Sequence, residues 1–488
     1  MSNRIKSIIA LLLAASLMVM VPACKGKDTG SESTSSVLAE SVESQTEPES
    51  EGGEASATAG SDVSVAGTPS TAASKAVTIP KKTVTIKFAS CWGQWEYGLP
   101  AGTNEGSDLY TKKFKEIKDK YNAEIVVESL DAATIDIVSK AIMAGDSPYD
   151  IMELDLVSAR RMALNGALYD QSTIKSINLN APQFSATKAV SEDVTYKGKV
   201  YGSQYGFPID SVMGVFVNVS LLSRLKQPDV KQLYKNNQWD WAHFEEIAKN
   251  VSRDTDGDSE NDIWGLACDS HVVGMAIGSN AGGTVLRSAS GAYTVGMTSD
   301  NGIEALNWIR KLYITDKSYN FFPSGAHDVY PDFTSGKVAF FPMYLVHLNS
   351  FGVEMKDDLT FLPFPKGPKQ PTYINGVHQA KVFAMPKTLK DPEYVGMIYQ
   401  ELSTVSNELN KIYEKRMRNF GLDEAGITTA MSMTKYMCAE FARGIDVSSF
   451  EKKMTDSIFS SNGNPSTTLV SVRSQFQKAV DDYYAKVK

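Results

Sequence analysis

The chain of 488 residues holds few of the residue types on which enzyme chemistry usually depends. It has four cysteines and five histidines, and neither set shows the spacing of a metal site. There is no GxSxG, no HExxH and no glycine-rich phosphate loop. The missing motifs argue against an enzyme. A glycoside hydrolase stays open as an alternative, because its paired carboxylates are set by the fold rather than by sequence spacing.

Positive charge is also scarce. The chain has 49 Lys and Arg against 57 Asp and Glu, a formal net charge of −8, and no basic cluster. A nucleic-acid partner would require lysine and arginine gathered on one face, so none is expected. Hydrophobic residues make up 42% of the chain and charged residues 22%, which is typical of a soluble globular protein of about two to three domains.

Three cysteines, Cys91, Cys268 and Cys438, lie far apart in the chain, with no CxxC among them. Buried free thiols are therefore expected rather than a zinc site or a disulfide framework. A single disulfide bond stays open at this point.

The N-terminus predicts export. Arg4 and Lys6 precede an apolar run over residues 8–21, which is too short for a comfortable membrane span. Residues 1–23 are therefore expected to be a signal peptide. The run ends in Val21-Pro22-Ala23-Cys24, which resembles a bacterial lipobox and predicts lipidation of Cys24, with palmitate as one acyl chain. A plain signal peptide is the alternative. In either case the mature chain lies outside the cell membrane, as expected for a Gram-positive-type bacterium.

Residues 24–80 are rich in Ser, Thr, Glu, Ala and Gly, and no aromatic residue occurs before Phe88. Such a segment buries too little apolar area to offset the entropy lost on ordering. It is expected to be a disordered spacer between the membrane and a globular body.

Strand and helix patterns alternate from residue 83 onward. Period-two runs over 83–89, 124–130 and 149–154 alternate with helical spacing over 108–121, 132–144 and 157–165. Further on, helices are expected over 241–251 and 299–313, and strands over 359–364 and 381–385. The alternation predicts an α/β fold with mostly parallel sheets.

Residues 198–222 contain two β-forming runs, over 200–207 and 212–219, separated by Pro208. Because proline cannot donate to a central ladder, the break favours a chain that leaves one sheet and enters another. This stretch is predicted to be a hinge between two lobes.

The densest group of acidic residues falls at 254–262. Asp254, Asp256, Asp258, Glu260 and Asp262 alternate with small or polar residues, and oxygen ligands at this spacing suit calcium. The glycine and the final glutamate of an EF-hand are missing from their usual places. The alternative is an acidic turn held by side-chain to backbone hydrogen bonds.

Tryptophan is the other signal of a site. Trp92 and Trp95 follow the first strand, at the end where ligand loops lie in open α/β sheets, and flat rings suit sugar stacking. A core position is the equally simple alternative for each of them. Trp239, Trp241 and Trp308 are assigned to packing.

Separated motifs resemble one family when taken in order. Gly145-Asp146-Ser147-Pro148-Tyr149-Asp150-Ile151 is similar to a Gly-x-x-Pro-Asp-Ile strand entry, and Gly198-Lys199-Val200-Tyr201-Gly202 with Pro208 to a Gly-Lys-x-Tyr-Gly-x-Pro crossover. Trp239-Asp240-Trp241 with Phe244, the segment 333–340 and the segment 362–368 continue the match. Together they resemble the extracellular solute-binding proteins of ABC importers, family 1, the class that includes maltose-binding protein.

This resemblance implies a two-lobed periplasmic-binding-protein-like fold of type II, joined by hinge crossovers, in a monomer. The lobes would comprise residues 81–209 with 375–425 and residues 210–374 with 426–488. The ligand-binding residues that it implies are Trp92, Trp95, Asp155, Tyr205, Asp210, Asn280, Tyr344, Asn375, His378 and Gln379.

The function implied by the resemblance is that of a tethered receptor, not an enzyme, which requires no cofactor and gives its solute to the membrane permease of an importer. A sugar or oligosaccharide is the expected solute. The alternatives are a peptide or polyamine receptor, a surface glycan-degrading enzyme, and an adhesin or scaffold that binds no small molecule.

Overall fold

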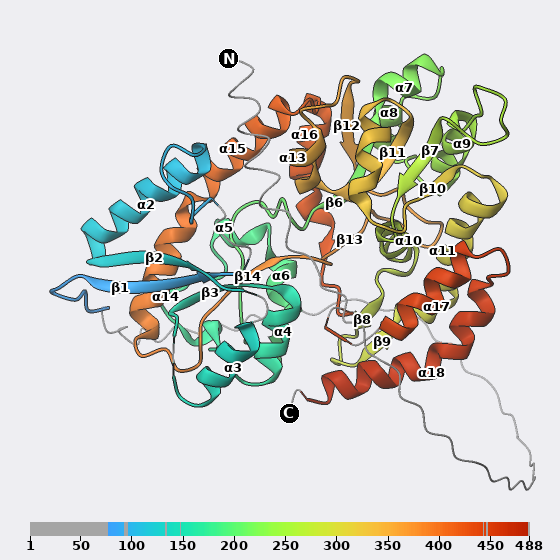
Figure 1. Cartoon of the computed structure of the whole chain (residues 1–488). Coiled ribbons are helices and arrows are strands. Elements are labelled where there is room, and N and C mark those ends of the chain that lie inside the picture. Colours follow the sequence, from blue (N-terminus) through green and yellow to red (C-terminus); the bar gives the residue numbers. More distant parts are fainter. Residues whose placement is uncertain are drawn as a thin grey trace, which may run out of the picture. The chain divides into compact units, whose positions relative to one another are not determined.

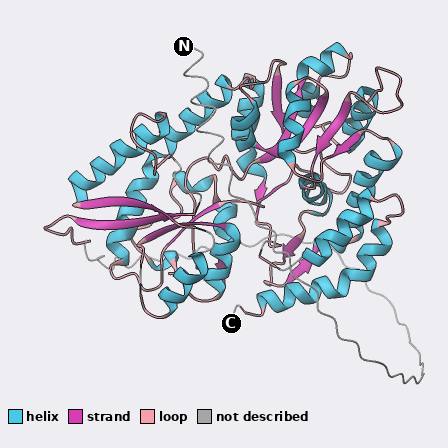
Figure 2. Ribbon diagram, in the orientation of Figure 1, coloured by secondary structure: helices cyan, strands magenta, loops and turns pink. Residues whose placement is uncertain are grey.

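The computed structural model of the protein describes residues 77–91, 96–131, 134–146, 148–442, 444–445 and 448–486. The predicted signal peptide, Cys24, the spacer as far as residue 76, Trp92 and Trp95 lie outside the described residues. Figures 1 and 2 show the helices and strands. Among the described residues, no helix is both long and apolar enough to cross a membrane.

The first sheet has four strands in the order β14-β3-β1-β2. β1 (Val84–Ser90), β2 (Ala123–Ser129) and β3 (Ile151–Asp155) run parallel, and β14 (Lys381–Ala384) runs antiparallel beside β3. Residues 151–154 of β3 are all buried, as expected for a strand covered on both faces. β14 follows every strand of the second sheet in the sequence, so the chain returns to the first sheet to supply its last strand.

Helices cover both faces of the first sheet, with α2 on one side and α3 and α4 on the other (Figure 1). These helices and their neighbours are α2 (Glu105–Tyr121), α3 (Ile135–Met143), α4 (Leu156–Leu164), α14 (Pro392–Leu402) and α15 (Ser406–Asn419). A capping box between Asn104 and Ser107 starts α2. Glu401 joins α14 to α2, because its carboxylate accepts a hydrogen bond from the Tyr121 hydroxyl at 2.7 Å and pairs with Lys113 at 3.3 Å.

The second sheet has five strands in the order β10-β7-β11-β6-β12. They are β6 (Met213–Asn218), β7 (Trp264–Cys268), β10 (Tyr319–Phe321), β11 (Val338–Tyr344) and β12 (Leu359–Leu362). β6 runs against both of its neighbours, and the other four strands share one direction. In each sheet all strands but one are therefore parallel, which confirms the predicted α/β class.

Tryptophan side chains fill the core beside the second sheet. The larger helices here are α9 (Trp241–Val251), α10 (His271–Ala281), α11 (Asp300–Arg310), α16 (Glu424–Ser432), α17 (Ser448–Phe459) and α18 (Pro465–Tyr484). Trp239 is fully buried, and its indole donates to the Pro363 carbonyl at 2.7 Å. Trp241 stacks on Trp308 with ring centroids 4.2 Å apart. The packing roles predicted for these three residues are confirmed.

Short elements complete the described chain. The short helices are α5 (Pro182–Ser185), α6 (Lys188–Asp193), α7 (Val219–Arg224), α8 (Val230–Lys235), α12 (Tyr330–Thr334) and α13 (Leu348–Phe351). The short strands are β4 (Thr195–Tyr196), β5 (Lys199–Val200), β8 (Val285–Arg287), β9 (Tyr293–Val295), β13 (Asn375–Gly376) and β15 (Met437–Cys438). The short 3-10 helices are η2 (Gln171–Thr173), η3 (Gly296–Thr298), η5 (Ala326–Val329), η6 (Leu345–His347), η7 (Ser403–Val405) and η8 (Met433–Tyr436), and η4 (Lys311–Thr315) is a π-helix.

Within the described residues, the chain passes three times between the two sheets or the helices packed on them, over residues 201–212, 363–380 and 420–423. The last passage joins α15 to α16, where the Asp423 amide donates to the Leu359 carbonyl of β12 at 2.9 Å. All strands of the first sheet fall within residues 81–209 and 375–425, and all strands of the second within 210–374. The lobe boundaries themselves stay predictions.

The strand predicted over residues 200–207 is wrong for most of its length. Only β5 and an isolated bridge between Ser203 and Phe383 are β-structure here. The amides of Gly206 and Phe207 donate instead to the Gln183 carbonyl and to Asn410 Oδ1. The apolar side chains of this stretch are buried by an irregular segment rather than by a ladder.

Candidate functional site

Polar side chains lie at the carboxyl end of the first sheet. The strand registers place Ser90 beside Glu153 and Asp155 beside Lys381. Glu153 is fully buried, and its Oε2 accepts a hydrogen bond from the Ser90 hydroxyl. Burial raises the pKa of the Glu153 carboxyl, and the nearby Lys381 ammonium opposes that rise. The sheet therefore ends in a buried group of charges.

The first passage between the sheets makes a tight turn at Pro208. The amides of Ser211 and Val212 both donate to the Pro208 carbonyl, at 2.8 and 3.1 Å. The turn buries two polar side chains, Asp210 at 5% exposed and Ser211 at 0%. Gln204 lies beside them, with its Nε2 donating to Asp210 Oδ1 at 3.4 Å.

The return passage lies against the first one. Asn375 is 3% exposed, and its Oδ1 accepts a hydrogen bond from the Met213 amide at 3.2 Å. His378 lies against α10, where a Cβ added at Gly274 would be 3.4 Å from its Cε1. A small cavity of about 10 Å³ lies between α10 and the return passage, lined by Met213, Gly274, Met275, Gly278, Phe364, Ile374, Asn375, Gly376 and His378.

Five buried side chains from these segments each keep one polar atom without a hydrogen-bond partner among the described residues. They are Glu153 (Oε1), Gln204 (Oε1), Asp210 (Oδ2), Ser211 (Oγ) and Asn375 (Nδ2), here called the crossover cluster. Native proteins pair almost all of their buried polar atoms, so a group of unpaired ones requires an explanation. A polar ligand held between the two sheets would pair them.

Two of the predicted ligand-binding residues, Asp210 and Asn375, belong to the crossover cluster. Asp155 lies next to it at the end of β3, where its Oδ1 accepts from the Ser158 amide at 2.9 Å and starts α4. Gln379 is half-buried in the return passage beside His378. Ligand contact by these residues stays a prediction.

Tyr205 and Asn280 lie inside their lobes. The Tyr205 ring stacks on Phe383 with centroids 5.0 Å apart, and its hydroxyl lies 3.2 Å from that of Tyr110. Asn280 is fully buried in α10, donates to Glu304 at 2.9 Å and accepts from the Lys369 amide at 3.0 Å. Each therefore has partners within the protein, and a ligand role for either stays a prediction.

Imidazole and phenol rings gather at the carboxyl end of the second sheet. Tyr344 ends β11, and its ring meets His271 edge-on with centroids 5.6 Å apart. His271 Nδ1 lies 2.7 Å from Asp269 Oδ1, directly after β7. His347 Nδ1 lies 2.5 Å from the Tyr330 hydroxyl. The order of the residues along the chain gave no sign of this group, because its members come from separate segments.

His347 is expected to make stability fall in mild acid. Burial and the neighbouring His327 and His271 lower its pKa to about 3, with Asp269 opposing. Between pH of about 6.5 and 3 the unfolded chain therefore takes up a proton that the native protein does not, so this contribution to stability falls as pH falls, by at most about 1.4 kcal/mol per pH unit. Urea unfolding of His347→Phe should show a shallower loss than wild type between pH 6 and 4.

The matched control is His243→Phe, at the first turn of α9, where the ring pairs with Asp240. This variant removes an imidazole that lies outside the buried group around His347, so it reports the effect of losing a histidine elsewhere. Equal slopes for His347→Phe and wild type would contradict the assignment.

The acidic loop brings three carboxylates together. Oxygens of Asp254, Asp256 and Asp262 lie within 4.8 Å of one another. The same groups also hold the loop: Asp254 accepts from the Gly257 amide at 2.6 Å, and Asp262 from the Thr255 amide at 2.7 Å. The Gly257 amide lowers the pKa of Asp254, and the Thr255 hydroxyl, together with the Thr255 amide, lowers the pKa of Asp262. Asp258 and Glu260 complete the exposed loop, and Asp258 accepts from the Glu260 amide at 2.8 Å.

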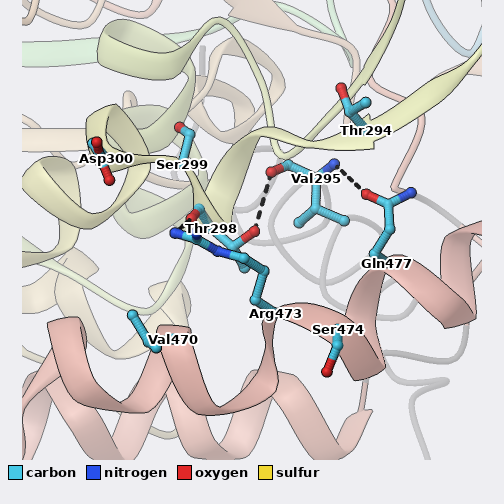
Figure 3. Close-up of a pocket in the computed structure, with 9 residues that line it drawn as sticks. All are labelled: Thr294, Val295, Thr298, Ser299, Asp300, Val470, Arg473, Ser474 and Gln477. Carbon is cyan, nitrogen blue, oxygen red and sulfur yellow. Dashed lines mark hydrogen bonds between the residues drawn. The ribbon is translucent and has the colours of Figure 1, made fainter. Parts of the chain in front are cut away.

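A separate groove of about 740 Å³ lies between η3 and α18 (Figure 3). Its walls are joined by Arg473, which donates to the Thr298 carbonyl, and by the Val295 amide, which donates to Gln477 at 3.1 Å. No member of the crossover cluster lines it.

Cys91, Cys268 and Cys438 are free thiols, as predicted, although only Cys268 is fully buried. Burial raises the pKa of all three, so they are uncharged and unreactive at neutral pH.

Two α/β lobes, three passages between them and a buried polar cluster beside the passages define a two-lobed binding protein. The family of bacterial extracellular solute-binding proteins matches residues 109–401, more than half of the chain, and the protein belongs to this family. No curated protein has a sequence that matches the chain.

Solved structures share the fold at low sequence identity. UspC from M. tuberculosis is 17% identical, with a TM-score of 0.59, over 81% of this chain and 100% of its own. UgpB from Mycobacterium tuberculosis, in complex with glycerophosphocholine, is 14% identical, with a TM-score of 0.58, over 82% and 99%. The cyclic alpha-maltosyl-1,6-maltose binding protein from Arthrobacter globiformis is 11% identical, with a TM-score of 0.57, over 82% and 100%.

Proposed function

We propose that the protein is a receptor that captures a carbohydrate or oligosaccharide between its two lobes and delivers it to an ABC importer. The observation that carries the proposal is the crossover cluster, five buried side chains whose unpaired polar atoms lie beside the passages between the sheets. Membership of the solute-binding family supports capture rather than turnover. The sugar assignment is supported by the maltosyl ligand for which the Arthrobacter globiformis protein is named.

The same proposal places the receptor on the outer face of the cell membrane, held by a lipid on Cys24. This rests on the basic start, the apolar run and the Val21-Pro22-Ala23-Cys24 ending. The partner would be the membrane permease of the importer, and the receptor would act as a monomer. Metabolic labelling with a palmitate analogue should label wild type and not Cys24→Ala.

A ligand panel tests solute capture. A solute that binds only the folded state stabilises it by about 2.7 kcal/mol at about 100 times its Kd, so the melting temperature should rise. Malto-, cello- and chito-oligosaccharides should include at least one that raises it, with no products after prolonged incubation. A rise with peptides only would overturn the sugar assignment, and cleavage of the best ligand would overturn the receptor.

We propose a structural calcium ion in the acidic loop, supported by the spacing of its oxygens. Chelation should then lower the melting temperature of wild type, calcium should restore it, and magnesium should not. Asp254→Asn should be insensitive to both treatments. If wild type responds to neither, hydrogen bonds within the loop are sufficient to hold it.

A further inference from the structure

The crossover cluster carries excess negative charge. Glu153 is fully buried and Asp210 is 5% exposed, and Asp155 adds a third carboxylate at the end of β3. Lys381, opposite Asp155 in the β3–β14 register, is the cation beside them. Of these described charged groups, three are carboxyls and one is an ammonium group.

The unpaired atoms of the cluster are mainly acceptors. Glu153 Oε1, Gln204 Oε1 and Asp210 Oδ2 can only accept a hydrogen bond when the carboxylates are ionised. The buried Tyr97 hydroxyl beside Glu153 is a further unpaired group, which can donate or accept. Asn375 Nδ2 can only donate, and the Ser211 hydroxyl can do either. A solute that fits must therefore present more donors than acceptors to this region.

A protonated amine meets both requirements better than a hydroxyl does. It offers three donors and a positive charge, whereas a hydroxyl offers one donor and no charge. Buried carboxylates are costly unless they are paired, so a cation between them is strongly favoured. The repulsion of Glu153 by Asp210 contributes to the raised pKa of Glu153, and a bound cation would relieve it.

We infer that the site selects a solute that carries a protonated amino group among its hydroxyls, such as a sugar with a free 2-amino group. This inference rests on the proposed capture of a saccharide at the crossover cluster. The amine would lie between Glu153 and Asp210, and Asn375 and Ser211 would bind neighbouring hydroxyls.

Isothermal titration of the full chain with matched ligands tests the inference. Chitosan trimer, its fully N-acetylated counterpart and maltotriose share a similar size, and the first carries the free amines. The deacetylated trimer should bind at least about 10-fold more tightly than the acetylated one, and its affinity should fall as salt is raised. Asp210→Asn should lose at least about 10-fold in affinity for the amine and much less for a neutral ligand.

Asp119→Asn, an exposed carboxylate on α2 that pairs with Lys115, is the matched control and should bind as wild type does. If Asp210→Asn fails to fold, Glu153→Gln repeats the test. The ratio of the affinities of wild type for the deacetylated and the acetylated trimer tests the inference without any variant. Tighter binding of a neutral trimer than of the deacetylated one would overturn the amine requirement without contradicting the proposed receptor function. Absence of binding by every saccharide would overturn the proposed function itself.

Discussion

Arg160→Met is expected to lower the free energy of unfolding by about 3–5 kcal/mol, because it breaks a fully buried ion pair and leaves one partner behind. Arg160, on α4, is 0% exposed and pairs with Asp193 of α6. Its guanidinium also donates to the Glu440 carbonyl at 2.6 Å. The Glu440 carboxylate in turn accepts from the amides of Thr284 and Val285, at 2.7 and 3.0 Å. The substitution would therefore loosen four separate segments.

The size of this loss should depend on pH. Burial raises the pKa of Asp193 to about 7, and the guanidinium of Arg160 limits that rise. Without Arg160 the pKa of Asp193 rises further. Above pH of about 7 the folded variant therefore still binds a proton at Asp193, whereas folded wild type and the unfolded chain have both released it. Stability falls as pH rises wherever the native state binds the extra proton, so the deficit of the variant should grow above that pH.

Urea unfolding at pH 6 and pH 8.5 measures both effects. Arg161→Met is the matched control, because the next residue along α4 makes only an exposed ion pair, 3.1 Å from Asp136, which is worth about 0–1 kcal/mol. A loss in Arg160→Met as small as that of the control, at both pH values, would show that the buried pair does not hold these segments together.

The elements that could be predicted from the sequence are those whose apolar period defines one buried face. The helix predicted over 241–251 is α9 to the residue, and the strand predicted over 83–89 is β1 shifted by one position. The run at 200–207 has the same aromatic and β-forming residues but pairs with a strand only at Val200 and Ser203. The amides of its last two residues donate to Gln183 and Asn410 instead. Whether this run forms a strand depends on pairing with distant segments, which local composition does not reveal.

The site could be predicted only in part for the same reason. The order of the motifs located Asp210 and Asn375 at the two passages. Glu153 was hidden within the run predicted as a strand over 149–154, although a carboxylate in an otherwise apolar central strand is itself unusual. Gln204 and Ser211 gave no signal, because their burial depends on residues far away in the chain.

Gly274→Phe is expected to lower the free energy of unfolding by about 1–3 kcal/mol or more and to weaken solute binding at least 30-fold, roughly the effect of losing one hot-spot contact. Gly274 on α10 faces His378, and the cavity between α10 and the return passage has a volume of only about 10 Å³. A phenyl ring cannot enter that space. The return passage would have to move, and Asn375 would move with it, away from the Met213 amide that it now binds at 3.2 Å.

Gly274→Ala separates the effect of volume from that of losing glycine. Its Cβ would lie 3.4 Å from the nearest atom of His378, an ordinary contact, and alanine within a helix is favoured over glycine by about 0.5–1 kcal/mol. The alanine variant should therefore match or exceed wild-type stability and keep wild-type affinity for the best ligand of the panel. Weak binding by the phenylalanine variant alone would mean that the position of the return passage, rather than helix content, controls capture. Equal affinity in both variants would remove Asn375 and His378 from the site and leave only the side chains of β3 and of the first passage to hold the solute.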